Sequence, residues 1–271
     1  MNRRKIWLGV GVAVLLPGAA ELVPETSGLL ARLARAAGAE GGEGGEGGEG
    51  GEGGEGGIDP EAARRDPVVF GTALAVVDAH LLAGLAAIEA GERELGATLF
   101  GHAIAEVYVD LEPTLEARGV PPFLADLEKA QAVAENGSPA EIRAAVDRVL
   151  AATAAAMEKA PADGRSRLAV EAGVLAETID RAALQYQSAA ARPDDLEAYL
   201  DGVGWKLVAE RKAANLLPEL SKSRAEAATA LSAALAALKP LYPAARPGAP
   251  ADAGAALAAA SKAKLAVVDL R

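Results

Sequence analysis

An uninterrupted Glu-Gly-Gly repeat, present six times over residues 40–57, divides this chain of 271 residues into two unequal parts. The repeat has no apolar side chain to bury and two glycines in every triplet, so it cannot form a folded core. Collagen also has glycine at every third position, but its triplets carry one glycine and are rich in proline. Residues 40–57 are therefore predicted to be a disordered acidic linker, and residues 58–271 must supply the folded domain.

The segment before the linker has the pattern of an export signal. Basic residues at positions 3–5 precede an apolar run over residues 6–16, which is too short for a membrane span of about 20 residues. Small residues at positions 18–20 predict a signal peptide over residues 1–20, and a second small-residue stretch allows cleavage as late as residue 39. We therefore expect a periplasmic or secreted bacterial protein with no stable membrane span after cleavage.

The apolar residues of the chain are mostly alanine, leucine and valine. Hydrophobic residues make up 51% of the sequence and aromatic residues only 3%, a mixture that favours helices over strands. Proline, glycine and capping residues punctuate these apolar stretches. They predict a short helix opening at Asp59-Pro60, helices over about 67–90, 92–118, 121–136, 138–160, 165–190, 193–216 and 223–238, and a terminal helix from about 251. The fold class predicted for 58–271 is an all-α antiparallel bundle of helical hairpins.

Some helix boundaries carry specific signals. The Asn-Gly pair at 136–137 is expected to end a helix in a left-handed backbone, and Ser138 with Glu141 forms a capping box that starts the next one. A second Ser-x-x-Glu pattern begins at Ser223. Four prolines between residues 240 and 250 predict a loose connection to a terminal helix that is weakly docked or frayed.

Composition excludes several classes of function. The chain has no cysteine, which removes disulfides, thiolate metal sites, cysteine nucleophiles and iron–sulfur clusters. Its net charge of −11 argues against nucleic-acid binding, which needs a basic face. No G-x-S-x-G, P-loop or dinucleotide-binding pattern occurs, so no catalytic motif is recognised and a non-enzymatic role is favoured. An enzyme that uses a bound ion as a Lewis acid would need an open coordination position.

The two histidines are the strongest candidates for a binding site. His80 and His102 each lie eleven residues from Gly91, at the predicted hairpin turn, so they should stand level on neighbouring helices. Glu106 follows His102 by one helical turn on the same face, and Asp110 follows by another. Two imidazoles and one or two carboxylates on facing helices are the ligands of iron, zinc or manganese sites in helical bundles. The alternative is that these are hydrogen-bonded core residues.

A second polar group occurs later in the chain. Tyr186 lies on one predicted helix, and Tyr199, Asp201 and Trp205 lie on the next. Tyr199 and Asp201 should point about 200° apart, whereas Asp201 and Trp205 share a face. A tyrosine phenolate can bind ferric iron, but tyrosines at helix edges are mostly packing residues, and packing is the favoured interpretation here.

Three short segments resemble a known group of proteins. Residues 79–84 and 100–106 are similar to the HLLxG and FGHPxxE stretches of a largely uncharacterised group of exported bacterial helical proteins, in which an acidic Gly/Glu-rich linker also follows the leader. Residues 198–205 are similar to an EYQDAxGF-type segment of that group, and distantly to the periplasmic domains of ferric-iron permeases. Imelysin-like iron-uptake proteins carry a G-x-H-x-x-E motif, whereas His102 and Glu106 are one residue further apart. The resemblance implies iron in preference to other metals.

The sequence thus predicts an exported helical protein that binds a metal ion through His80, His102, Glu106 and Asp110. Iron is favoured, with zinc or manganese next, and the expected role is periplasmic metal handling. The alternative is a non-catalytic helical scaffold that binds a periplasmic or membrane protein and has structural histidines. His102→Ala should abolish ion binding in the first case and only loosen the fold in the second.

Overall fold

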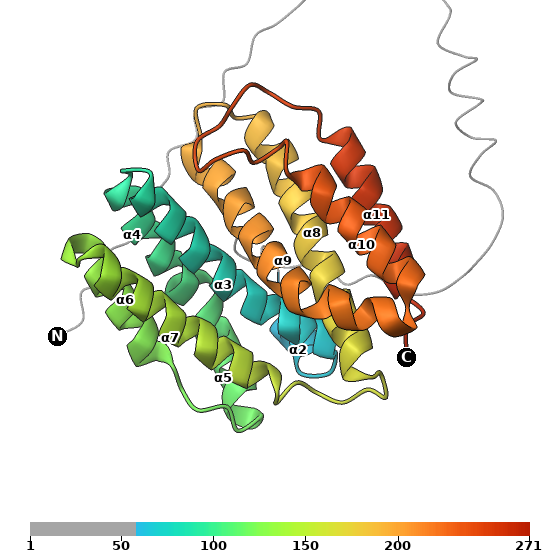
Figure 1. Ribbon diagram of the computed structural model, residues 1–271. Helices are drawn as coiled ribbons and strands as arrows, with labels where there is room; N and C mark the ends of the chain where they lie inside the picture. The colour runs from blue at the N-terminus through green and yellow to red at the C-terminus, as the bar shows by residue number, and fades with distance from the viewer. Residues whose placement is uncertain (1–57) are drawn as a thin grey trace, which may run out of the picture. The chain divides into compact units, whose positions relative to one another are not determined.

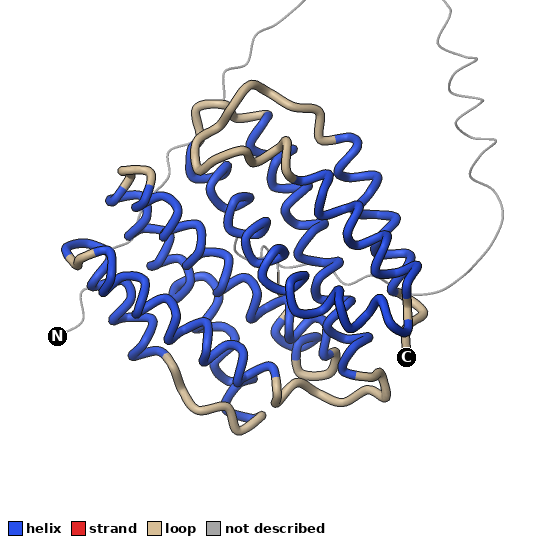
Figure 2. Tube along the Cα trace, in the orientation of Figure 1, coloured by secondary structure: helices blue, strands red, loops and turns tan. Residues whose placement is uncertain are grey.

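The computed structural model describes residues 58–271, and every regular element in that range is a helix (Figure 2). The predicted signal peptide and the linker over residues 40–57 lie outside the described residues. The helices are α2 (Pro60–Ala63), α3 (Pro67–Glu89), α4 (Arg93–His102), the π-helix η1 (Ala103–Tyr108), α5 (Val109–Ala117), α6 (Leu124–Asn136), α7 (Pro139–Met157), α8 (Arg167–Ala190), α9 (Leu196–Ser223), α10 (Ala225–Leu238) and α11 (Gly254–Val267). The all-α prediction is confirmed.

Helix α3 occupies the middle of the bundle. It packs against α4 and α7 on one side and against α8 and α9 on the other (Figure 1). Helix α6 completes the first side by packing on α4 and α7, and α10 and α11 complete the second by packing on α8 and α9. Two groups of antiparallel helices therefore share α3 as a common core element.

The composition of α3 follows from this central position. By length and hydropathy alone, α3 is the one helix of the described residues that could cross a membrane. Most of its apolar stretch is covered by the surrounding helices, and Phe70, Val77 and Leu81 have no exposed surface. A helix that is apolar on all sides is expected where neighbours cover it completely.

Two of the predicted helix starts have side-chain caps. The Asp66 carboxylate accepts hydrogen bonds from the first turn of α3, directly before Pro67. At α7 the capping box is confirmed: the Ser138 hydroxyl accepts from the Glu141 amide at 3.3 Å, and the Glu141 carboxylate accepts from the Ser138 amide at 2.8 Å. These local bonds satisfy amides that the helix itself leaves unpaired.

Other boundary predictions are wrong. Helix α9 does not end at Leu216 but continues through Pro218 to Ser223, because Leu216 and Leu220 both remain buried and keep the helix packed. Ser223 is therefore the last residue of α9 and does not cap α10, which has no side-chain cap. Helix α6 ends at Asn136 as predicted, but Gly137 has φ −74° and ψ 162°, an extended backbone rather than the left-handed one expected.

Three tyrosines hold the proline-rich connection between α10 and α11, which was expected to be loose. The Tyr242 hydroxyl donates to a carbonyl of α8 at 2.7 Å, and the Tyr199 hydroxyl donates to the carbonyl of Ala244 at 2.9 Å. The Ala251 amide donates to the Tyr186 hydroxyl at 2.8 Å. Tyr186 and Tyr199 thus act as the packing residues that the sequence favoured, and they fix this connection to the bundle.

The terminal helix α11 is docked and not frayed. Its small residues Ala256 and Ala260 are buried where it packs against α8 and α10. Lys264 lies between two acidic residues of α8, with its Nζ 2.9 Å from Glu177 and 3.0 Å from Asp180. Alanine allows the close helix approach, and the partly exposed ion pairs fix its register.

Candidate metal site

The α3–α4 hairpin brings the two histidine-bearing helices together. Gly91 ends α3 with φ +92°, a conformation that favours glycine. Beyond the turn the helices meet at two further glycines: a Cβ on Gly84 would lie 2.5 Å from the Phe100 ring, and one on Gly96 would lie 2.6 Å from the carbonyl oxygen of Gly84. This close contact holds the two helices in one register.

The predicted pairing of the histidines is confirmed. The imidazole rings of His80, on α3, and His102, at the end of α4, have centroids 5.9 Å apart and are nearly perpendicular. His80 is buried, and about a quarter of the His102 side chain is exposed. The equal distances of the two residues from Gly91 along the chain therefore predicted their contact correctly.

Glu106 lies between the two histidines. One carboxylate oxygen is 3.8 Å from Nε2 of His80, and the other is 3.6 Å from Nδ1 of His102. Glu106 belongs to η1, the π-helix that begins directly after His102. Such wider turns inside helices occur frequently at functional sites.

Helix α9 adds two further carboxylates to this cluster. Glu197 lies 3.4 Å from Nδ1 of His102, and Asp201 lies 3.5 Å from Nδ1 of His80. The approach of α9 to α3 depends on Gly204, where a Cβ would lie 2.2 Å from the carbonyl oxygen of Ala79. The resulting cluster contains two imidazoles and three carboxylates from three separate stretches of the chain.

Several buried polar atoms of the cluster have no hydrogen-bond partner. They are both ring nitrogens of His80, Nδ1 of His102, one oxygen of Glu106 and one oxygen of Asp201. The separations of 3.4–3.8 Å exceed the length of an N–H···O hydrogen bond. An unpaired buried polar group costs about 1–3 kcal/mol, so a concentration of them in one place requires an explanation.

These separations are close to those between ligands of a shared ion. Donors held about 2.1 Å from one ion lie about 3.4 Å apart in tetrahedral geometry and about 3.0 Å apart in octahedral geometry. Within residues 58–271, no three His, Asp or Glu side chains are arranged so that they could hold a metal ion as they stand.

A pocket of about 200 Å³ opens beside the cluster. His80 and Asp201 line it together with Trp205, Arg192 and Gln185. The predicted shared face of Asp201 and Trp205 is therefore found in the structure. The pocket gives water or a small ion a polar route to the His80 side of the cluster.

The structure places the other predicted residues differently. Asp110 is exposed on α5 and makes no contact with the histidines, because only Glu106 lies on the face of the helix that meets α3. Tyr199 turns away from Asp201 to the α10–α11 connection. Glu197 was missed, although its position four residues before Asp201 places both carboxylates on one helical face.

No protein-family model matches the chain, and comparisons with curated proteins and with solved structures give no significant match. The resemblance to exported helical proteins and to iron-uptake domains therefore stays a prediction.

Proposed function

We propose that the cluster binds a metal ion, with Nε2 of His80, Nδ1 of His102 and the Glu106 carboxylate as ligands and Glu197 as a fourth candidate. Two imidazoles and one carboxylate are the ligand composition of many non-haem Fe(II) sites, so iron is the favoured ion. Zinc and manganese accept the same donor types and come next.

One observation carries this proposal: nitrogen and oxygen atoms of His80, His102, Glu106 and Asp201 face one another at 3.5–3.8 Å, and buried atoms among them have no hydrogen-bond partner. A cation between Nε2 of His80, Nδ1 of His102 and Glu106 would give these three groups a partner and offset the charge of the Glu106 carboxylate. The rival interpretation, a core of structural histidines, would favour direct hydrogen bonds among these groups.

Asp201 has a supporting role in this proposal. The two nitrogens of one imidazole point in opposite directions and cannot bind the same ion. With Nε2 of His80 directed to Glu106, its Nδ1–H would donate to Asp201, which lies 3.5 Å away. Carboxylates in this position fix the tautomer and orientation of metal-binding histidines.

The proposed biological role is metal handling after export, without catalysis. Its support is the signal-peptide pattern of residues 1–20, the acidic linker and the lack of a catalytic motif. The partners would be the ion itself and a periplasmic or membrane protein that receives it.

Glu106→Gln tests the site most sharply, because it removes one charge and one strong donor without changing side-chain size. Asp110→Asn is the matched control, since it removes an exposed carboxylate one helical turn away. Each full-length variant and the wild type would be titrated anaerobically with Fe(II), and then with Zn(II), by calorimetry, with helicity checked by circular dichroism.

We expect wild type and Asp110→Asn to bind close to one ion per chain, and Glu106→Gln to bind at least tenfold more weakly while folded. His80→Ala/His102→Ala should abolish binding. If the wild type takes up neither ion, or if all variants bind equally, the metal site is refuted and the histidines are structural.

A further inference from the structure

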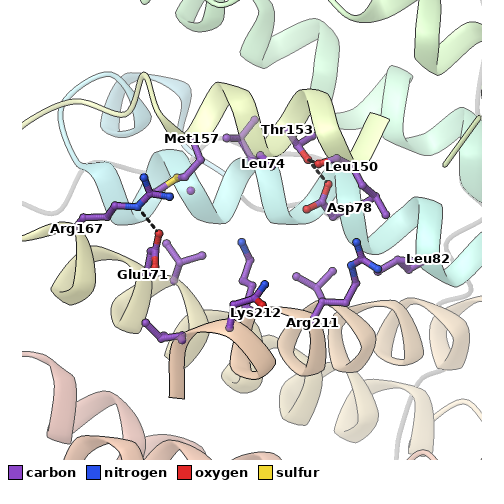
Figure 3. Close-up of a pocket in the computed structure, with 16 residues that line it drawn as sticks. Leu74, Asp78, Leu82, Leu150, Thr153, Met157, Arg167, Glu171, Arg211 and Lys212 are labelled. Atoms are coloured by element: carbon purple, nitrogen blue, oxygen red, sulfur yellow. Dashed lines mark hydrogen bonds and ion pairs between the residues drawn. The ribbon is translucent and has the colours of Figure 1, made fainter. Parts of the chain in front are cut away.

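A second cavity lies on a different face of α3. It has a volume of about 390 Å³ and is enclosed by α3, α7, α8 and α9 (Figure 3). None of the five residues of the histidine cluster lines it. Its volume is within the range of natural sites for small organic ligands.

The cavity carries two basic side chains that share one carboxylate, Asp78, and form no close ion pair with it. Arg211 and Lys212, both on α9, make no hydrogen bond and no ion pair within 4 Å with any of the residues 58–271, although both charges act on Asp78, and Figure 3 shows them directed toward α3. The third base, Arg167, is already paired with Glu171 at 2.7 Å and with Glu158 at 2.6 Å. Only the α9 pair is therefore available to a ligand.

The acidic groups of the cavity leave a net positive charge. The charge of Glu171 is balanced by Arg167, and Asp78 accepts a hydrogen bond from the Thr153 hydroxyl at 2.7 Å. Asp78 is the one remaining acid opposite Arg211 and Lys212. One unit of positive charge stays uncompensated, which a single carboxylate on a ligand would neutralise.

Part of the remaining wall is apolar, and Thr153 and Asn215 add polar groups to it. Leu74 of α3 and Leu150 and Met157 of α7 line the cavity across from the basic pair (Figure 3), and Val174 of α8 also lines it. An apolar wall with a few convergent polar groups is the usual design of a site for an organic ligand. Methionine adds adaptability, because its unbranched side chain fits different shapes.

We propose that this cavity binds a small organic monocarboxylate, with its carboxylate between Arg211 and Lys212 and its apolar body against Leu74, Leu150 and Met157. Hydrogen bonds from two cationic donors to one carboxylate are strong, which accounts for the class of ligand. The site is separate from the histidine cluster and does not depend on a metal ion.

Calorimetric titration of the full chain with octanoate tests this site, with octylamine as the probe of opposite charge. Lys212→Gln combined with Arg211→Gln removes the proposed anion contacts at partly or fully exposed positions that should not disturb folding. Lys206→Gln is the matched control, because Lys206 lies on the same helix but pairs with Glu210 and does not line the cavity.

We expect the wild type and Lys206→Gln to bind one octanoate per chain, and the double variant to bind it at least tenfold more weakly. Glu106→Gln should leave octanoate binding unchanged, which separates this test from that of the metal site. The inference is overturned if octanoate does not bind to the wild type at millimolar concentration, if octylamine binds equally well, or if the double variant keeps full affinity.

Discussion

Asp78 gives the fold a pH dependence that one isosteric substitution should remove. Burial against α7 and α9 raises the pKa of Asp78 from 3.8 to about 6, since water no longer solvates the carboxylate fully. Three neighbours lower the pKa in part, namely Lys212 and Arg211 through their positive charges and Thr153 through its hydrogen bond. Desolvation has the larger effect, so the native state holds the proton of Asp78 more tightly than the unfolded chain does.

The sign and size of the effect follow from proton linkage. Between pH 4 and pH 6 the native state binds more protons than the unfolded state, so its stability falls as the pH rises. Each tenfold difference in proton affinity corresponds to about 1.36 kcal/mol. A pKa that moves from 3.8 to about 6 therefore lowers the free energy of unfolding by about 3 kcal/mol at neutral pH, relative to acid pH.

The substitution Asp78→Asn keeps an oxygen that can accept from Thr153 but cannot become charged. Urea unfolding of the wild type and the variant between pH 4 and pH 8 would measure the difference in their free energies of unfolding. We expect the free energy of unfolding of the variant, relative to that of the wild type, to rise by about 2–3 kcal/mol between pH 4 and pH 7. Asp110→Asn, at an exposed position, should leave the profile of the wild type unchanged. Parallel profiles for the wild type and Asp78→Asn would refute the argument.

Two further substitutions test the packing of α9 and the start of α7. Gly204→Ala should destabilise the chain by about 1–3 kcal/mol in urea unfolding, because its Cβ would lie 2.2 Å from the carbonyl oxygen of Ala79. Gly101→Ala is the control, because its Cβ would meet only the end of the Gln131 side chain, and its free energy of unfolding should change by less than about 1 kcal/mol. Equal losses of stability in Gly204→Ala and Gly101→Ala would contradict this reasoning. Ser138→Ala should cost about 1 kcal/mol in the same assay, and no loss would show that the capping box contributes nothing.

Most of the helical architecture could be predicted because its signals are local. A capping residue or a glycine with positive φ acts within one turn of the chain, as Ser138 and Gly91 do. The wrong boundaries arose where packing overrides such signals. Pro218 would end an isolated helix, but buried leucines on both sides of it keep α9 continuous. The docking of α11 also depends on contacts with α8 and α10 that its alanine-rich sequence does not specify.

The candidate site also combines contacts set by local sequence with contacts set by the packing of distant helices. The contact of His80 with His102 follows from one turn and two equal chain lengths, so counting residues was sufficient to predict it. The approach of Glu197 and Asp201 depends on how α9 crosses α3, more than one hundred residues later in the chain. Because Glu197 and Asp201 are four residues apart, the sequence predicts that they share one face of their helix. Nothing in the local sequence predicts that this face meets the histidines.

The spacing of His102 and Glu106 shows how local and distant constraints combine. Glu106 follows His102 by four residues, and the π-helix η1 begins directly after His102. Within this wider turn, a carboxylate oxygen of Glu106 lies 3.8 Å from Nε2 of His80. Glu106 thus owes its position to its own helix, whereas Asp201 and Glu197 owe theirs to the close contact at Gly204. A substitution that separates α9 from α3 should therefore weaken ion binding while the His80–Glu106–His102 arrangement persists.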